Sequence, residues 1–238
     1  MQSYSAIAKY YDSFTQNDCD YESWSQYLSD VAQAHGVKSV VDVACGTGKM
    51  TELLCKRGFD VTGVDGSAQM LAEASSKCKG RFVLQDMTKL TLPHAVDMAV
   101  CVNDGVNYLP PKKLAAFFLR VAKNLKCGAP FVFDVSSPYK LKNVVGNNVF
   151  FVDDEDVTLL WSNKLYGGHV NMSLTLFERQ GQTYVRSDES HTQYLHTVRE
   201  ISEALAESGF RLDEVTAEYG KKLRQDSLRI TFLAIKEE

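Results

Sequence analysis

The stretch Val40-Val41-Asp42-Val43-Ala44-Cys45-Gly46-Thr47-Gly48 joins an apolar run to an acidic residue and then to a turn of small residues. Glycine adopts positive φ without steric cost, and Gly46 and Gly48 carry no side chain that would block a close approach to the backbone. A turn of this kind brings backbone N–H groups close to a ligand at the start of the following helix. The stretch therefore predicts a strand, a tight turn and a helix that form a nucleotide-type cofactor site.

The glycine spacing separates two classes of nucleotide cofactor. The dinucleotide fingerprint G-x-G-x-x-G needs a third glycine for close packing of the helix on the strand. Counted from Gly46 and Gly48, that position holds Thr51. A nicotinamide-dependent oxidoreductase, one of the alternatives for this chain, is therefore disfavoured.

Two further apolar runs end in acidic residues. Val61-Thr62-Gly63-Val64-Asp65-Gly66-Ser67 places a carboxylate where it can accept both hydroxyls of a ribose. Leu84-Gln85-Asp86-Met87 ends the third run. Each acid alone has a structural interpretation: Asp42 as a partner of a helix N-terminus, Asp65 as a turn residue and Asp86 as the end of a strand. Three such ends in order are far more specific than any one of them.

In this combination the chain resembles the class I S-adenosylmethionine (SAM) dependent methyltransferases, and in particular bacterial enzymes of the small-molecule type. Those enzymes carry Asp-Val-Ala-Cys-Gly-Thr-Gly, an N-terminal segment like Tyr10-Tyr11-Asp12, and a motif like Asn103-Asp104-Gly105-Val106-Asn107-Tyr108-Leu109 after the fourth strand. The resemblance covers nearly the whole chain. It implies SAM as the cofactor and S-adenosylhomocysteine as its product, without a metal.

The resemblance also implies which residues hold the cofactor. The loop from Asp42 to Gly48 would bind the methionine end, Asp65 the ribose, and Asp86 with the Met87 backbone the adenine. Tyr11 would close over the cofactor, although helix packing is an equal alternative for it. The full expected set is Tyr11, Asp42, Ala44, Cys45, Gly46, Gly48, Asp65, Gly66, Ser67, Met70, Asp86, Met87 and Asn103. Within this set, Cys45 needs only its backbone, and Met70 fits core packing equally well.

Two residues are candidates for contact with the methyl acceptor. Asp104 follows the fourth strand and could orient or deprotonate the acceptor, with a structural Asx turn as the alternative. His191 could act as a base, with strand pairing or the surface as the more common role for such a histidine. The Asn/Asp-Pro-Pro-Tyr/Phe motif and a Pro-Cys pair are both missing from the sequence. Methylation of nucleic-acid bases therefore loses support, and the acceptor atom stays open.

Alternation of strand and helix signals predicts an α/β fold. Strands are expected at 38–43, 60–65, 81–85, 96–102, 129–135, 210–219 and 228–236, with helices at 48–56, 67–77, 112–125 and 197–208. From about 149 to 193 the pattern changes to β-type alternation, which predicts a small antiparallel meander with strands at 159–166, 169–177 and 183–194. The resemblance implies the Rossmann-like class I sheet in the order 3-2-1-4-5-7-6, with strand 7 antiparallel. The expected division is a SAM-binding core with an N-terminal cap (1–138 and 196–238) and an inserted β subdomain, the substrate lid, after strand 5 (139–195).

Composition limits the class of protein. The 238 residues are 45% hydrophobic and 24% charged, which suits one domain with an insertion. A net charge of −4 argues against a nucleic-acid surface and favours a small-molecule partner. Six cysteines without a C-x-x-C pair are expected to be reduced thiols, and neither a signal sequence nor a long apolar run is present, so a cytoplasmic protein without a membrane anchor is expected. No metal-ligand spacing occurs, and the sequence assigns no oligomeric state.

A SAM-binding sensor or assembly protein without transfer activity is the alternative function. Such a protein would keep the loop from Asp42 to Gly48 and Asp65, but would not need polar residues after the fourth strand or aromatic residues in an N-terminal cap. Asn103-Asp104 and Tyr10-Tyr11 are both present. The sequence therefore favours an enzyme that moves a methyl group.

Overall fold

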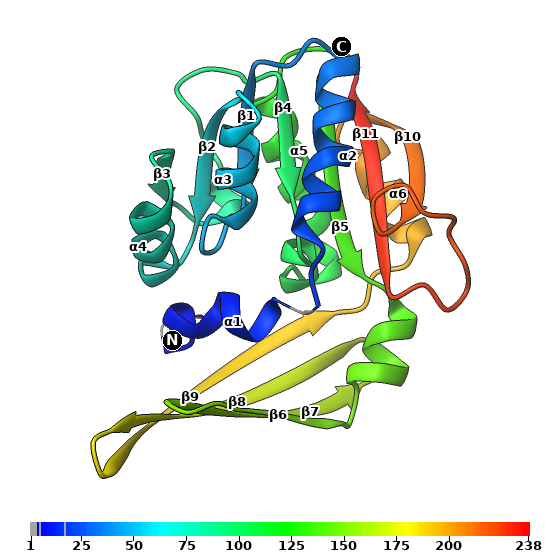
Figure 1. Cartoon of the computed structure of the whole chain (residues 1–238). Coiled ribbons are helices and arrows are strands. Elements are labelled where there is room, and N and C mark those ends of the chain that lie inside the picture. The colour runs from blue at the N-terminus through cyan, green and yellow to red at the C-terminus, as the bar shows by residue number, and fades with distance from the viewer. Residues whose placement is uncertain (1–3, 5, 17) are drawn as a thin grey trace.

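The computed structural model describes residues 4, 6–16 and 18–238, which form two β-sheets with flanking helices (Figure 1). The larger sheet has seven strands in the order β10-β11-β5-β4-β1-β2-β3. Its strands are β1 (Ser39–Val43), β2 (Asp60–Asp65), β3 (Arg81–Leu84), β4 (Met98–Cys101), β5 (Pro130–Ser136), β10 (Phe210–Ala217) and β11 (Arg229–Lys236).

The strand order confirms the predicted class I methyltransferase sheet. β1 pairs in parallel with β2 and β4, while β2 pairs with β3 and β4 with β5 in the same sense. β11 is the seventh strand of this sheet and pairs antiparallel with both β5 and β10. The sequence order and the spatial order thus reverse between β1 and β4, where open α/β sheets bind their ligands.

Helices cover both faces of the large sheet. Successive strand residues point to opposite faces, so neighbouring residues of one strand pack against different helices. Val41 belongs to a core cluster with Phe117 and Ile201, whereas Val40 belongs to a second cluster with Trp24 and Leu54. The helices are α2 (Tyr21–Ala34), α3 (Lys49–Lys56), α4 (Ala68–Lys77), α5 (Leu114–Lys123) and α6 (Val198–Ala206), with the short α1 (Tyr11–Thr15) near the N-terminus. Short 3-10 turns are η1 (Ala8–Tyr10), η2 (Met87–Lys89), η3 (Gly105–Tyr108) and η4 (Pro111–Lys113), and η5 (Lys140–Val145) is a π-helix.

The smaller sheet is an antiparallel meander in the order β6-β7-β8-β9, which we call the meander. Its strands are β6 (Val149–Asp153), β7 (Val157–Tyr166), β8 (His169–Gln180) and β9 (Thr183–Tyr194). The prediction of three strands was wrong, because β6 is a fourth. Four of the five β6 residues are exposed, so this strand lacks the alternation that reveals the others and is defined only by its pairing with β7.

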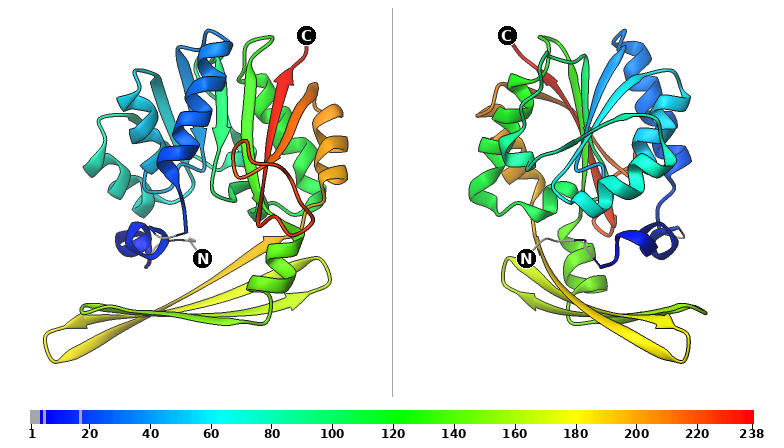
Figure 2. Two further views of the ribbon diagram at one scale, coloured as in Figure 1. Left: turned by 45° about the vertical axis from the view of Figure 1, so that its right-hand side comes forward. Right: turned by 90° about the vertical axis from the view of Figure 1, so that its left-hand side faces the viewer.

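The meander lies across the end of the large sheet at which the parallel strands finish, and α1 lies between the two (Figures 1 and 2). A third core cluster joins Ile7 near the N-terminus and Leu141 of η5 to the inner face of the meander, including Met172 and Leu174. Within the residues described, no helix has the length and apolar character needed to cross a membrane.

Candidate active site

The loop after β1 has an unusual backbone. Ala44, Gly46 and Gly48 all have left-handed φ values, of 58°, 56° and 76°. The Cys45 N–H donates to the Val64 carbonyl at 3.1 Å, and the Gly46 N–H donates to Asp65 Oδ2 at 2.8 Å. The loop is therefore tied to the end of β2, and its turn is fixed before any ligand arrives.

A cavity of about 390 Å³, which we call the sheet-edge cavity, opens at the ends of β1, β2, β3 and β4. Most of the predicted cofactor residues line it: Tyr11, Ala44, Gly46, Asp65, Gly66, Ser67, Met70, Asp86, Met87 and Asn103. The wall also includes residues that the sequence prediction missed, namely Tyr4, Val64, Gln85, Gly105 and Tyr108. Its volume lies in the ~300–1,000 Å³ range of small-molecule sites.

The two acids of this cavity differ in their hydrogen bonds. Asp65 Oδ1 accepts the Ser67 N–H at 2.8 Å and Oδ2 accepts the Gly46 N–H, yet burial still raises the pKa of Asp65. Asp86 Oδ1 accepts both the N–H and the hydroxyl of Thr88 at 2.8 Å. Burial raises the pKa of Asp86, but these bonds outweigh it and bring the pKa below its usual value. Each carboxylate keeps lone pairs for a ligand hydroxyl or amine.

Three predicted cofactor residues lie outside the wall of the sheet-edge cavity. Asp42 is fully buried, its Oδ2 accepts the Thr51 hydroxyl at 2.6 Å, and burial raises its pKa to about 7. Cys45 lines a separate cavity of about 40 Å³, and burial raises the pKa of its thiol well above the usual value. The side chains of both residues therefore lie away from the sheet-edge cavity.

Gly48, the third of these residues, serves packing rather than ligand approach. A Cβ at this position would lie 2.8 Å from the Cβ of Ala74 on α4 and 3.3 Å from Cζ of Phe82. At Gly46, by contrast, a Cβ would meet nothing within 4 Å. The open backbone of the loop is therefore at Gly46, and Gly48 lets the start of α3 pack against α4 and β3.

The loop after β4 is held by a buried group of charges that the sequence prediction missed. Asn103 and Asp104 both have left-handed φ values, of 59° and 63°. Asp134 on β5 accepts both of their N–H groups at 2.8 Å, and Arg229 of β11 donates to Asp104 and Asp134. The only signal in the sequence is an acid inside the apolar run Phe131-Val132-Phe133-Asp134-Val135.

This group of charges also limits what Asp104 can do. Burial raises the pKa of Asp104, but the nearby cations Arg229 and Lys140 outweigh it and hold the pKa below its usual range. A carboxylate that is already paired and hard to protonate is a weak base. Of the two predicted roles, the geometry favours orientation over deprotonation.

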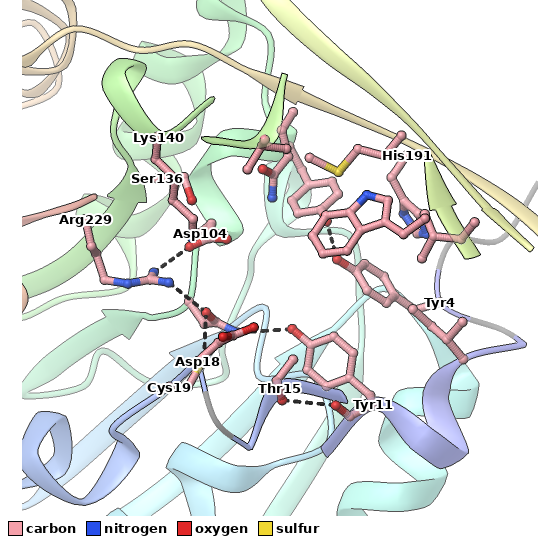
Figure 3. Close-up of a pocket in the computed structure, with 18 residues that line it drawn as sticks. Tyr4, Tyr11, Thr15, Asp18, Cys19, Asp104, Ser136, Lys140, His191 and Arg229 are labelled. Carbon is pink, nitrogen blue, oxygen red and sulfur yellow. Dashed lines mark hydrogen bonds and ion pairs between the residues drawn. The ribbon is translucent and has the colours of Figure 1, made fainter. Parts of the chain in front are cut away.

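A second cavity, of about 140 Å³, lies between the meander and the end of the large sheet, and we call it the meander cavity (Figure 3). Both predicted acceptor-side residues, Asp104 and His191, line it. Its walls come from the end of the large sheet, the inner face of the meander and the described residues before α2 (4, 6–16 and 18–20), which we call the N-terminal segment. The lining residues include Ile7, Thr15, Asp18, Cys19, Ser136, Lys140, Trp161, Met172, Leu174, Gln193 and Arg229. Tyr4, Tyr11, Asn103 and Tyr108 line both this cavity and the sheet-edge cavity.

The N-terminal segment covers the loop after β1. Asp12 accepts the hydroxyl of Thr47 and pairs with Lys77 at 2.8 Å. The Tyr11 hydroxyl accepts from Asn103 Nδ2 at 3.1 Å. These contacts hold Tyr11 between the two cavities.

Comparison with known proteins agrees with this architecture. Residues 40–128 match a family described as a methyltransferase domain. A Geobacillus sp. (strain WCH70) protein that bears the name of a methyltransferase is 32% identical over 98% of this chain and 99% of its own.

Solved structures show the same relationship. The crystal structure of a SAM-dependent methyltransferase from Clostridium acetobutylicum ATCC 824 is 32% identical, with a TM-score of 0.89 and 99% of each chain covered. At 21% identity, the sugar N-methyltransferase KedS8 from Streptoalloteichus sp. ATCC 53650 shares the fold, with a TM-score of 0.80 over 96% of this chain and 93% of its own. On its fold and on relatives that match it from end to end, the chain belongs to the SAM-dependent methyltransferases.

Proposed function

We propose that the protein transfers a methyl group from SAM in the sheet-edge cavity to a small molecule in the meander cavity. The observation that carries this proposal is the shared wall, because Tyr4, Tyr11, Asn103 and Tyr108 line both cavities. The two cavities adjoin at these four residues. A donor in one cavity and an acceptor in the other would therefore approach each other there.

The chain's residues fit SAM. The carboxylate of Asp65 has lone pairs left for the ribose hydroxyls, and Asp86 Oδ2 is left for an adenine amine, since Oδ1 accepts both Thr88 donors. Gly46 leaves open space beside the loop, which suits the methionine end. The sulfonium of bound SAM supplies an activated methyl group.

The task left to the protein is alignment and exclusion of water. Correct alignment of two reactants contributes on the order of 7–11 kcal/mol in favourable cases. Here Tyr4 and Tyr11 cover the site from the N-terminal side, and Asp134 fixes the loop that carries Asn103 and Asp104.

The dimensions of the meander cavity favour a small acceptor. Its volume of about 140 Å³ is below the ~300–1,000 Å³ typical of sites for drug-sized ligands. KedS8 methylates a sugar nitrogen by its name, but a likeness at 21% identity extends to the fold alone. The small size of the acceptor is therefore inferred from the volume of the meander cavity.

Calorimetric titration with SAM and S-adenosylhomocysteine tests the donor side. We expect micromolar binding of both, weakened by at least about tenfold in Asp65→Ala, which is ~1.4 kcal/mol. Tritiated SAM incubated with a small-metabolite fraction, and separately with protein and RNA fractions, tests the acceptor side. Absence of SAM binding by the folded protein, or label only in the macromolecular fractions, would contradict the proposal.

A further inference from the structure

Glu189 on β9 joins the N-terminal segment to the meander. Its carboxylate accepts the backbone N–H of Tyr4 at 3.0 Å and that of Ala6, and it lies 3.0 Å from Nε2 of His191. Burial raises the pKa of Glu189, but the bonds from His191 and the two backbone groups outweigh it and lower the pKa below its usual value. Glu189 is therefore an ionised carboxylate that faces both the N-terminal segment and an imidazole.

This contact fixes the tautomer of His191. An ionised carboxylate can only accept hydrogen bonds, so Nε2 of His191 must carry the proton that it donates to Glu189. In a neutral imidazole the other nitrogen, Nδ1, then has a free lone pair. The His191 side chain is 2% exposed, and Nδ1 has no hydrogen-bond partner among the described residues. A buried acceptor without a partner is costly, and here it belongs to a side chain in the wall of the meander cavity.

We propose that His191, oriented by Glu189, accepts the proton of the methyl acceptor, and that the acceptor is a small nucleophile with an O–H or N–H to lose. This inference rests on the proposed function and specifies its acceptor class. Neutral thioethers and tertiary amines, which have no proton to lose, fall outside this class.

Atoms and charge are conserved in the transfer. A lone pair on the acceptor oxygen or nitrogen forms the bond to the methyl carbon, and the carbon–sulfur bond breaks with its electron pair on sulfur. The O–H or N–H proton passes to Nδ1 of His191. The resulting imidazolium donates from Nε2 to Glu189, whose negative charge stabilises it.

The same carboxylate connects this base to the N-terminal segment. The Tyr4 ring lies 4.5 Å from the His191 ring, centroid to centroid, and the Tyr4 hydroxyl is hydrogen-bonded to that of Tyr108. The titratable groups that face His191 are thus Glu189 on its own strand, Tyr4 from the N-terminal segment and Tyr108 from η3, whose ring centroid lies 6.2 Å from that of His191. Asp104, Lys140 and Arg229 line the same cavity. In this arrangement one carboxylate both orients the base and holds the backbone of Tyr4 and Ala6.

The first test reads the tautomer directly and needs no acceptor. Nitrogen-15 NMR of histidine-labelled protein with S-adenosylhomocysteine, at about pH 8 where an ordinary histidine is neutral, gives the protonation of each ring nitrogen. The His191 signals are assigned by their loss in His191→Gln. We expect a proton on Nε2 and none on Nδ1. A proton on Nδ1 would overturn the proposal, because no lone pair would then be available for the acceptor.

Two carboxylate variants distinguish orientation of His191 by Glu189 from mere attachment of the N-terminal segment. Glu189→Gln removes the charge beside His191 and is expected to give a mixture of tautomers. Glu178→Gln is the matched control, because Glu178 on β8 also binds this segment, through Lys9 at 2.7 Å and the Tyr10 hydroxyl at 2.7 Å. Its His191 signals should match those of the wild type. Equal effects of the two variants on the His191 signals would show that Glu189 only holds the N-terminal segment and does not orient His191.

The second test uses phenol, benzyl alcohol and benzylamine as probe acceptors with tritiated SAM. For a probe that is methylated, His191→Gln should lower kcat by roughly 10²-fold or more, as expected for loss of a general base, with the SAM Kd unchanged. Transfer at the wild-type rate in His191→Gln would overturn the proposal. Absence of SAM binding by the wild-type protein would instead overturn the proposed function. The NMR measurement would still determine which nitrogen of His191 carries the proton.

Discussion

The Asp134 carboxylate on β5 accepts the backbone N–H of Asn103 at 2.8 Å, in the loop after the neighbouring strand β4. Asp134 is fully buried and also accepts from Asp104, Arg229 and the Tyr219 hydroxyl. Two adjacent non-glycine residues with positive φ are unfavourable by themselves. This carboxylate therefore stabilises a strained loop that separates the two cavities.

Asp134→Asn should destabilise the protein strongly. The substitution leaves Arg229 buried with one of its two carboxylate partners removed, and breaking a buried pair in this way costs about 3–5 kcal/mol. Urea unfolding followed by circular dichroism measures the loss. Asp188→Asn, which removes an exposed partner of Arg186, is the control and should leave the urea midpoint unchanged. Similar midpoints for the two variants would show that the buried group contributes little.

Gly46→Ala and Gly48→Ala should separate binding from stability. Both place alanine at positive φ, at a cost of about 1–2 kcal/mol. Only Gly48→Ala also brings a Cβ within 2.8 Å of Ala74, and overpacking of this kind adds about 1–3 kcal/mol. Gly46→Ala should instead weaken SAM binding about tenfold or more, by filling the open space beside the loop. Calorimetry and urea unfolding of both variants give the comparison, and the opposite ranking would contradict the assignment of the two glycines.

The buried Asp42 should make stability depend on pH near neutrality. Its pKa is raised from 3.8 to about 7 by burial. Because the folded protein holds this proton more tightly than the unfolded chain, the contribution is fully present below about pH 4 and is lost as pH rises to about 7. The free energy of unfolding of the wild type, minus that of Asp42→Asn, should fall between pH 5 and 7 and change little above that. A difference that stays flat over this range would mean that Asp42 is already ionised in the folded protein at pH 5.

Asp12→Ala, which removes the acceptor of the hydrogen bond from Thr47, should speed the release of SAM. The Asp12 carboxylate joins the N-terminal segment to Thr47 in the loop after β1. Loss of one hydrogen bond of this type is worth about 0.5–1.5 kcal/mol, or roughly a 2- to 10-fold increase in the dissociation rate. Stopped-flow measurement of SAM release tests this. Ser13→Ala is the control and should release SAM at the wild-type rate, because among the described residues the Ser13 hydroxyl donates to the nearby Tyr10 carbonyl and makes no other hydrogen bond.

The parts of the site that are local in sequence could be predicted. The turn at Gly46 and the acids Asp65 and Asp86 each lie at or just after the end of a parallel strand, so their position at one edge of the sheet follows from the topology. The helix expected over 67–77 is also local in sequence, and the structure has it as α4, with the Ser67 hydroxyl accepting the Met70 N–H at 3.3 Å. The sheet-edge cavity is lined by Gly46, Asp65, Ser67, Met70 and Asp86 among others.

The remaining parts depend on contacts between distant segments. Arg229 meets Asp104 across 125 residues, and Glu189 meets Tyr4 across 185. Neither pair has a local motif, because a charge in a strand gives no sign of its partner until the strands and the meander are assembled. Strand β6 was missed for a related reason, since its residues are mostly exposed and only pairing with β7 defines it.

The position of Arg229 near the C-terminus has a consequence for folding during synthesis. Every other residue in the wall of the meander cavity precedes Arg229 in the chain. During translation, the loop after β4 is therefore synthesised more than a hundred residues before the cation that neutralises its buried acids. A nascent chain that stops short of β11 has Asp104 and Asp134 without this counter-charge, so competence to bind ligand should appear abruptly, when β11 leaves the ribosome and inserts between β5 and β10.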